Sequence, residues 1–232
     1  MIRVIDLNAD LGEGVTDDAG LLEVVTSANV ACGYHAGDAE IMRAVCEESV
    51  RRGVAVGAQV SYADRENFGR VPLDVPYRVL REQVADQVGT LSGIAVAAGT
   101  RVDYVKPHGA LYSRVADDEE QAQAVLDGSG DLPVLGLPAS IIVAMARAAG
   151  RAAHHEGFPD RAYTPSGRLV PRSEPGAVLH DSEEIAGRAV TMALSGEVAS
   201  VCVHGDSPGA VTSATLVRRA LEEAGLELRS FV

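Results

Sequence analysis

The sequence predicts an α/β fold in which parallel strands form a (β/α) barrel, seven-stranded and irregular. Three observations indicate this class: short apolar runs alternate with longer amphipathic stretches along the chain, no hairpin signal joins neighbouring runs, and polar residues follow several runs. Strands and helices in alternation predict a parallel sheet. An open doubly wound sheet also fits, but it concentrates its site at one switch point. Since a barrel gathers all its strand ends at one mouth, we favour the barrel.

The expected strands are short apolar runs, a length that favours strands over helices. They are Val4–Asn8, Ser27–Cys32, Ala55–Ser61, Asp103–Lys106, Val134–Leu137, Ala152–Glu156 and Val198–His204. Apolar residues at helical spacing predict helices at Ala39–Arg52, Tyr77–Ala98, Asp118–Leu126, Ala139–Ala149, Ser182–Leu194 and Ala210–Glu223. Asp38 is the expected N-cap of the first of these helices, and Gly53 its expected end. The proline-rich segment 158–175 has no helical period and is expected to be a functional loop.

Length and charge limit the classes of protein to consider. A chain of 232 residues fits one domain spanning 1–232, and 33 acidic against 20 basic side chains give a net charge of −13. Such a surface repels phosphate, so we expect no nucleic-acid partner. The longest uncharged stretch, 132–146, is too short to span a membrane. Three cysteines without a CxxC pair, and no signal-peptide pattern, predict a cytoplasmic protein with reduced thiols.

Four expected strand ends share one pattern, in which polar or ionisable residues and glycines follow an apolar run. These ends are 6–14, 29–38, 104–112 and 202–209. Each has a structural alternative: Asp10 and Glu13 could cap a helix, His35 and Asp38 could form a turn and its cap, and His108 could lie in a surface turn. His204 and Asp206 could be a satisfied core pair. Their recurrence at one topological place predicts an active site.

Lys106 is the only lysine among 20 basic side chains. It ends an expected buried strand, two residues before His108. An ammonium can lose its proton or stabilise an oxyanion, whereas a guanidinium does not titrate. The alternative is a lysine in a surface turn.

Known short motifs are missing from the chain. It contains no HExxH, CxxC, GxSxG or GxxxxGK[ST], and no GxGxxG follows a strand. A divalent metal therefore stays open, with Asp10, His35 and His108 as candidate ligands. Arg161 and Arg172 could hold a substrate carboxylate or pair with acidic residues in their own loop. His154, His155 and His180 are interpreted as structural.

Several segments together resemble the LamB/YcsF family. They are Leu7–Glu13, Asn29–Asp38, Tyr104–Tyr112, Asp160–Tyr163, Val170–Arg172 and Val203–Ala210. The resemblance runs from the first strand to the last. It implies a seven-stranded barrel like that of glycoside hydrolases and polysaccharide deacetylases. It also implies opening of the lactam of 5-oxo-L-proline to L-glutamate at the expense of ATP, with two partner subunits that handle ATP.

Two residues depart from the family pattern. Gln59 stands where the family often has histidine, which puts a metal at that corner in doubt, and Pro159 stands where a small residue is common.

The hypothesis that follows assigns a role to each candidate. Asp10 or Glu13 activates water, assisted by His35 or His108; Lys106 stabilises the oxyanion; His204 and Asp206 orient or donate a proton. Asp38 belongs to the catalytic candidates, and Asn8, Asn29, Gln59, Tyr112, Arg161 and Arg172 to the substrate-binding ones. Two alternatives stay open: a stand-alone, metal-dependent amide or carbohydrate N-deacetylase, and a non-catalytic binding subunit of an enzyme complex. The sequence does not fix the oligomeric state and is compatible with a homo-oligomer.

Overall fold

Seven parallel strands form a closed barrel in the computed structural model, which describes residues 3–15, 17–205 and 209–232. The strands are β1 (Arg3–Leu11), β2 (Ser27–Ala31), β3 (Ala55–Val60), β4 (Val102–Pro107), β5 (Val134–Gly136), β6 (Ala153–Gly157) and β7 (Ser200–Val203). Each pairs with its neighbour in sequence, and β7 pairs with β1 to close the ring. The predicted seven-stranded parallel barrel is therefore confirmed.

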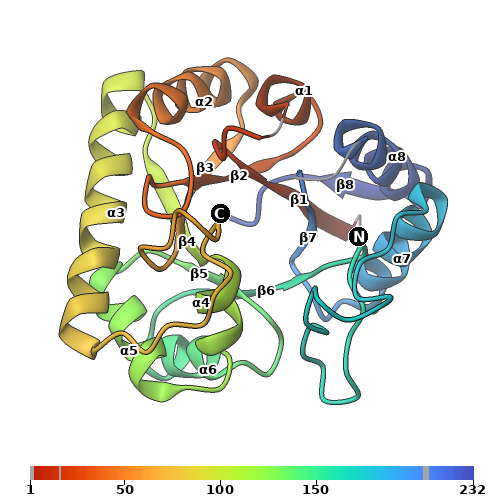
Figure 1. Cartoon of the computed structure of the whole chain (residues 1–232). Coiled ribbons are helices and arrows are strands. Elements are labelled where there is room, and N and C mark those ends of the chain that lie inside the picture. Colours follow the sequence, from red (N-terminus) through yellow and green to blue (C-terminus); the bar gives the residue numbers. More distant parts are fainter. Residues whose placement is uncertain (1–2, 16, 206–208) are drawn as a thin grey trace.

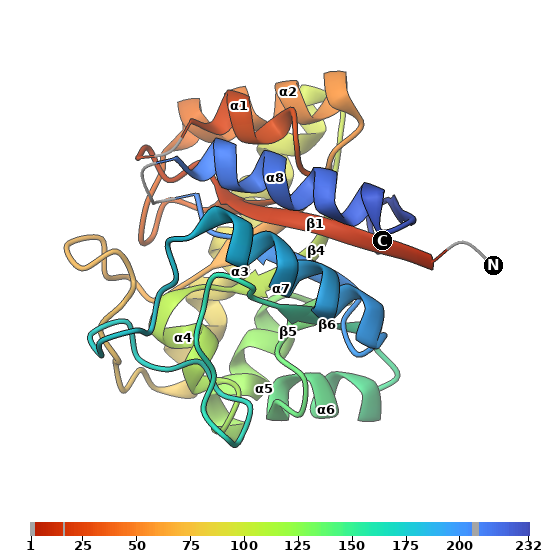
Figure 2. The same cartoon turned by 90° about the vertical axis from the view of Figure 1, so that its right-hand side faces the viewer.

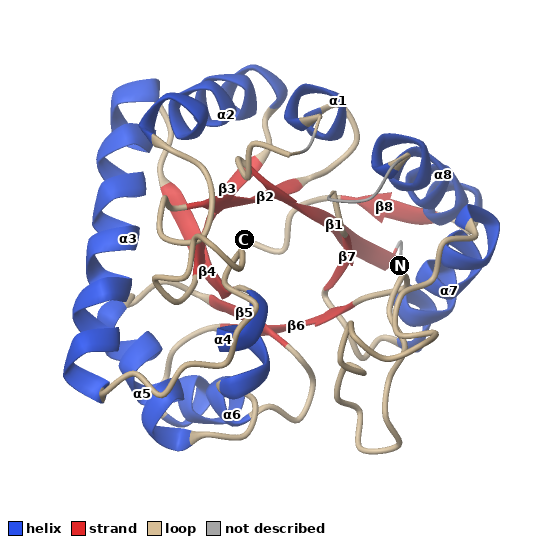
Figure 3. Ribbon diagram, viewed as in Figure 1, coloured by secondary structure: helices blue, strands red, loops and turns tan. Residues whose placement is uncertain are grey.

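Helices surround this barrel (Figures 1 and 3). They are α1 (Asp18–Leu22), α2 (Ala39–Arg52), α3 (Tyr77–Ala98), α4 (Gly109–Arg114), α5 (Glu119–Gly128), α6 (Ile141–Ala148), α7 (Ser182–Ser195) and α8 (Ala210–Glu223). The predicted helices are all present, and α2, α3 and α8 have the predicted bounds. The sequence did not reveal α1 and α4, because five and six residues are too few to show a helical period.

Helix α2 illustrates how local sequence sets an element's ends. The Asp38 carboxylate accepts hydrogen bonds from the backbone N–H groups of Glu40 (2.9 Å) and Ile41 (3.0 Å). Gly53 ends the helix with φ 69°, a left-handed conformation that glycine adopts without strain. Both residues act as the sequence predicted.

The inside of the barrel is polar near β1. Because side chains alternate along a strand, Asp6, Asn8 and Asp10 project inward, where they contact residues of other strands. Ile5 and Leu7 lie on the other face and belong to the hydrophobic core that the strands share with the helices. Barrel interiors are usually filled by branched aliphatic side chains, so this interior holds polar groups at a cost in stability.

A short strand that the sequence analysis missed leads the chain to the far end of the barrel. Strand β8 (Leu226–Leu228) pairs with the first residues of β1, outside the closed ring. The chain then turns inward: the Phe231 ring lies 4.9 Å from the rings of Tyr104 and of His154, and the Ser230 and Ser27 hydroxyl oxygens are 3.0 Å apart. Figures 1 and 2 show this end of the chain at the barrel centre, on the side where β1 begins. The far end of the barrel is thereby covered.

The connection after β6 is long, as predicted from its prolines. Two isolated antiparallel bridges, Arg161 with Val178 and Tyr163 with Leu169, hold it together. Among the described residues, no helix is long and apolar enough to cross a membrane.

Replacing Phe231 with alanine should lower the free energy of unfolding by about 1–2 kcal/mol, because a partly buried ring leaves the end of the barrel. Urea denaturation measures this change. Val232→Ala is the control, since Val232 is 46% exposed and its truncation should change stability by less than about 0.5 kcal/mol. Equal effects of both substitutions would contradict the packing role of Phe231.

Candidate active site

The Lys106 ammonium lies at the centre of a buried cluster at the carboxyl end of β4. Its Nζ is 3.2 Å from Asp10 Oδ1 and 3.0 Å from Glu156 Oε2, and it donates a hydrogen bond to Asn8 Oδ1 at 3.3 Å. Cys202 Sγ lies 3.2 Å away. Only 2% of Lys106 is exposed, so the surface-turn alternative is wrong.

Burial and mutual attraction compete in setting the charges of this cluster. Burial alone would lower the pKa of Lys106 and raise the pKa of Asp10. The attraction between the two groups outweighs burial, so the pKa of Lys106 stands well above its ordinary value and that of Asp10 below it. Burial raises the pKa of Glu156 despite its contact with Lys106. At neutral pH the cluster therefore holds a charged Lys106–Asp10 pair beside a glutamate that gains a proton more readily than usual.

A chain of buried hydrogen bonds fixes the amide of Asn8 against Lys106. The Asn8 Nδ2 donates to Ser200 Oγ at 2.6 Å, and the Ser200 hydroxyl in turn donates to Asp6. The Asn8 Oδ1 is left to face Lys106 and also accepts from Asn29 Nδ2 at 2.7 Å. Burial raises the pKa of Asp6 to about 6.

A second cluster gathers Glu13, His35, Gln59 and His108, from the ends of β1 to β4. The two imidazole rings stack with centroids 4.3 Å apart, and their Nε2 atoms lie 4.0 Å (His35) and 3.6 Å (His108) from Glu13 Oε1. The Gln59 amide lies between Glu13 and His35: its Nε2 donates to Glu13 Oε1 at 3.1 Å, and its Oε1 is 3.2 Å from His35 Nε2. All four side chains are buried.

Both histidines of this cluster are neutral at pH 7. Burial lowers the pKa of His35 to about 4, and burial together with the neighbouring His35 holds the pKa of His108 well below its ordinary range. Neutral imidazoles can accept a proton or bind a metal ion. The metal-ligand candidates from the sequence were Asp10, His35 and His108. The structure instead groups Glu13 with the two histidines, while Asp10 pairs with Lys106.

A third element of the site is a histidine–aspartate pair on the other side of the mouth. His204 Nδ1 lies 2.7 Å from Asp160 Oδ2, and the His204 backbone N–H also donates to this oxygen at 3.2 Å. Although burial would raise the pKa of Asp160, its contact with His204 keeps that pKa below its usual value. Asp206, the partner that the sequence suggested, lies outside the described residues.

The predicted substrate-binding residues fall into two groups. Asn8 and Asn29 are fully buried and bond to other polar groups of the barrel, so they position Lys106 and Asp10 rather than face the mouth. Tyr112 lies edge-on to Phe158, with ring centroids 5.5 Å apart, and burial raises the pKa of its hydroxyl well above the ordinary value. Arg172 lies close enough to Asp160 for its charge to help lower the pKa of that carboxyl.

Two candidates from the sequence are occupied elsewhere. Asp38 is exposed and caps α2, so the structural alternative holds and we leave it out of the catalytic set. Arg161 donates from Nε to the Ala177 carbonyl at 3.1 Å and from Nη2 to the Val170 carbonyl at 2.6 Å. Its guanidinium therefore holds the 158–181 connection together, and Arg172 is the better candidate for a substrate carboxylate.

Sequence reasoning missed Glu156 and Asp160. A signal for Glu156 was present, since it ends an apolar run and precedes Gly157, the pattern of the four strand ends that were chosen. Asp160 gave no such signal, because it lies in the irregular connection and meets His204 only through the fold.

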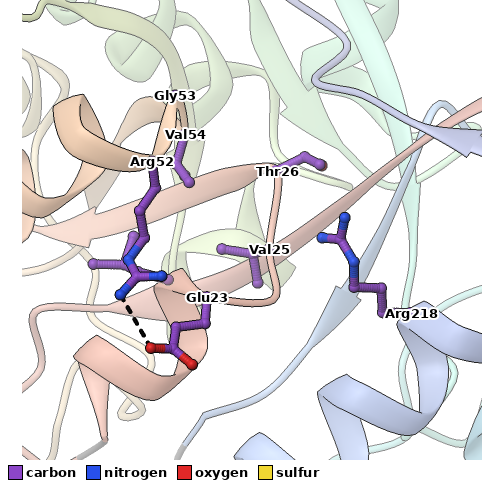
Figure 4. Close-up of a pocket in the computed structure, with 8 residues that line it drawn as sticks. Glu23, Val25, Thr26, Arg52, Gly53, Val54 and Arg218 are labelled. Atoms are coloured by element: carbon purple, nitrogen blue, oxygen red, sulfur yellow. Dashed lines mark hydrogen bonds and ion pairs between the residues drawn. The ribbon is translucent and has the colours of Figure 1, made fainter.

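A surface pocket lies away from this mouth, beside the starts of β2 and β3 (Figure 4). Both of its arginines are committed: Arg52 pairs with Glu23 at 3.1 Å, and Arg218 pairs with Glu222 at 3.0 Å. The pocket therefore offers no uncommitted charge for a ligand.

Ionisable groups at the carboxyl ends of barrel strands define the class of barrel enzymes. The solved structure of a family 4 carbohydrate esterase from Streptomyces lividans shares this fold, with a TM-score of 0.55 at 11% identity over 99% of this chain and 93% of that one. The LamB/YcsF family model matches residues 5–232, and the chain belongs to this family.

Two relatives show how close the similarity is. The protein named as the A subunit of 5-oxoprolinase in Streptomyces griseus is 53% identical, with 98% of this chain and 100% of the relative aligned. The crystal structure of a lactam utilization protein from Thermus thermophilus has a TM-score of 0.91 and 37% identity over 98% of this chain and 100% of that one. The similarity thus covers the whole barrel.

Replacing Lys106 with methionine should destabilise the fold by about 3–5 kcal/mol at pH 7, because two buried carboxyl groups lose their cation. The pKa of Asp10 is low only while Lys106 is present, so in the variant both carboxyls gain protons as the pH falls. The deficit should therefore be smaller at pH 5 than at pH 7. Urea denaturation at both pH values measures it.

Arg101→Met is the matched control, because the Arg101 side chain is 84% exposed in its pair with Asp103 and should contribute less than about 1 kcal/mol. A Lys106→Met deficit no larger than that of the control would contradict the buried pair.

Proposed function

We propose that this chain is the A component of an ATP-dependent 5-oxoprolinase, which opens the lactam of 5-oxo-L-proline to give L-glutamate. The single observation that carries the proposal is the similarity along the whole barrel to relatives that bear the name of the 5-oxoprolinase A component. The Thermus thermophilus protein, named for lactam utilization, points to the same substrate class. The site at the mouth supplies the groups that lactam opening needs.

A lactam is a stable amide, and its hydrolysis has three requirements. The carbonyl oxygen must be activated, a water molecule must lose a proton, and the leaving nitrogen must gain one. We assign activation of the oxygen to ATP, through phosphorylation or an equivalent step carried out by the partner subunits. This chain then holds the activated ring and carries out the proton transfers.

Lys106 is the group assigned to the developing oxyanion. Its high pKa keeps it charged, and its contacts with Asp10, Glu156 and Asn8 hold it in place before substrate binds. Preorganised charge of this kind costs no reorganisation during the reaction.

The base that activates water is assigned to Glu13 with His35 or His108, rather than to Asp10. Asp10 is held ionised by Lys106, and a carboxylate with a lowered pKa is a weak base. The two histidines are neutral and can accept a proton. His204, oriented by Asp160, lies on the other side of the mouth and is assigned to protonation of the leaving nitrogen.

The letter in the relatives' name supports an assembly with other subunits. We propose two partners that bind and hydrolyse ATP, since this chain has no recognisable nucleotide motif. Dependence on ATP places the reaction in the cytoplasm.

One observation favours an alternative, a stand-alone metal-dependent amide or carbohydrate N-deacetylase: the grouping of Glu13, His35 and His108. Such an enzyme would hydrolyse its substrate without ATP or partners, and removal of metal would abolish its activity. A non-catalytic subunit, in contrast, would tolerate substitutions at the mouth without loss of turnover by the complex.

In the assembled complex, Lys106→Met should reduce ATP-dependent glutamate release by at least about 10²-fold, because the oxyanion loses its cation. Asp10→Asn should have a smaller effect in the same direction, since it alters the position and charge of Lys106. A coupled glutamate assay measures both, with Arg101→Met as the control. Near-normal turnover in both variants, with folding intact, would reject the assignment.

Asp160→Asn should lower kcat by roughly 10²-fold through loss of the orientation of His204. Loss of the carboxylate also disfavours the protonated imidazole, so the alkaline limb of the pH–rate profile should move to lower pH. Asp181→Asn is the matched control, because Asp181 caps α7 and asparagine caps equally well. An unchanged pH–rate profile would refute the positioning role of Asp160.

A further inference from the structure

Three side chains at the mouth converge without a hydrogen-bonding role that accounts for all of them. Glu13, His35 and His108 each offer a donor atom within 4.8 Å of the other two, and this is the group with metal-site spacing within residues 3–15, 17–205 and 209–232. They come from the loops after β1, β2 and β4, so the barrel itself brings them together. We propose that these three residues bind a divalent transition-metal ion.

The donor set specifies the class of ion. Two imidazoles and one carboxylate suit Zn²⁺, Co²⁺ or Ni²⁺, whereas Ca²⁺ and Mg²⁺ prefer ligand sets made of oxygen alone. Histidine binds metal only as the neutral ring, and burial keeps both rings neutral at pH 7. No proton therefore has to be displaced from an imidazolium when the ion enters.

Unused hydrogen-bonding capacity is the second observation. Nδ1 of His35 and Nδ1 of His108 are both buried and have no hydrogen-bond partner. Buried polar atoms are nearly always paired in folded proteins, so two unpaired nitrogens in one stacked pair need an explanation. Packing alone does not provide it, because an apolar pair would fill the same space without that cost. A ligand for the rings does.

The surroundings hold the pair rigidly and keep the site apolar on one side. The Phe68 ring lies edge-on to both imidazoles, at 5.9 Å from His35 and 5.8 Å from His108. Phe68 has φ 59°, a conformation that costs a bulky residue energy and persists only where the structure enforces it. Arg65 enforces it in part, by donating to the carbonyls of Gly33 (3.0 Å) and Gly37 (2.8 Å) in the loop that carries His35. Rigid, apolar surroundings are typical of metal sites.

Gln59 modulates the site. Its amide bridges Glu13 and His35 and fixes the orientation of both. Its oxygen is a weaker ligand for such ions than an imidazole nitrogen. This chain should therefore bind the ion less tightly than a variant with histidine at position 59.

The test is metal binding by the purified full-length chain, stripped with chelator and then titrated with Co²⁺. The wild-type protein should bind one equivalent and develop the visible absorption of Co²⁺ bound to nitrogen and oxygen ligands. His108→Ala should weaken binding by roughly 10²-fold or more, because loss of a ligand exceeds the 10–100-fold cost of losing a residue that supports one. Gln59→His should tighten binding at least about tenfold.

His180→Ala is the matched control, since His180 is exposed and precedes α7. It should bind Co²⁺ like the wild type, and circular dichroism checks that every variant is folded. Absence of a stoichiometric Co²⁺ spectrum from the wild type would overturn the proposal. So would binding that His108→Ala and Gln59→His leave unchanged.

This inference concerns ion binding and is separable from the proposed reaction. Co²⁺ binding with no glutamate release from the complex would leave the metal site standing and reject the 5-oxoprolinase assignment. Glutamate release by a chain that binds no Co²⁺ would do the reverse.

Discussion

The buried ion pair between Lys106 and Asp10 is the constraint on which the rest of the site depends. An ammonium taken out of water is tolerated only with compensating charge and hydrogen bonds, and β1, β6 and β7 supply them from three sides. This requirement explains the polar barrel interior, where Asp6, Ser200 and Asn8 form a hydrogen-bonded chain toward Lys106. A barrel selected for stability alone would fill this space with aliphatic side chains.

The mouth divides its tasks between two sides. Neutral histidines beside Glu13 lie over the first four strands, and the His204–Asp160 pair lies over the last ones. Lys106 stands between them on β4. Groups that accept and donate protons are thus separated by the cation, an arrangement suited to a reaction in which water loses a proton and a nitrogen gains one.

Much of this architecture was predictable from the sequence, for a physical reason. Alternation of strands and helices leaves few topologies, and glycines after apolar runs mark the strand ends, so Lys106 and the histidines could be placed together. Short-range patterns could not show which acid meets which base. Asp160 reaches His204 from 44 residues away, and Glu13 rather than Asp10 joins the histidines, because the turn after β1 directs each side chain differently. Asp38 satisfied two interpretations in the sequence, and only its exposure and its cap bonds decide between them.

The most direct measurement is glutamate release from 5-oxo-L-proline by this chain co-purified with the products of its neighbouring genes. The account predicts release that requires ATP and stops when this chain is left out. Undiminished release by the partners alone, or hydrolysis by this chain alone without ATP, would contradict it.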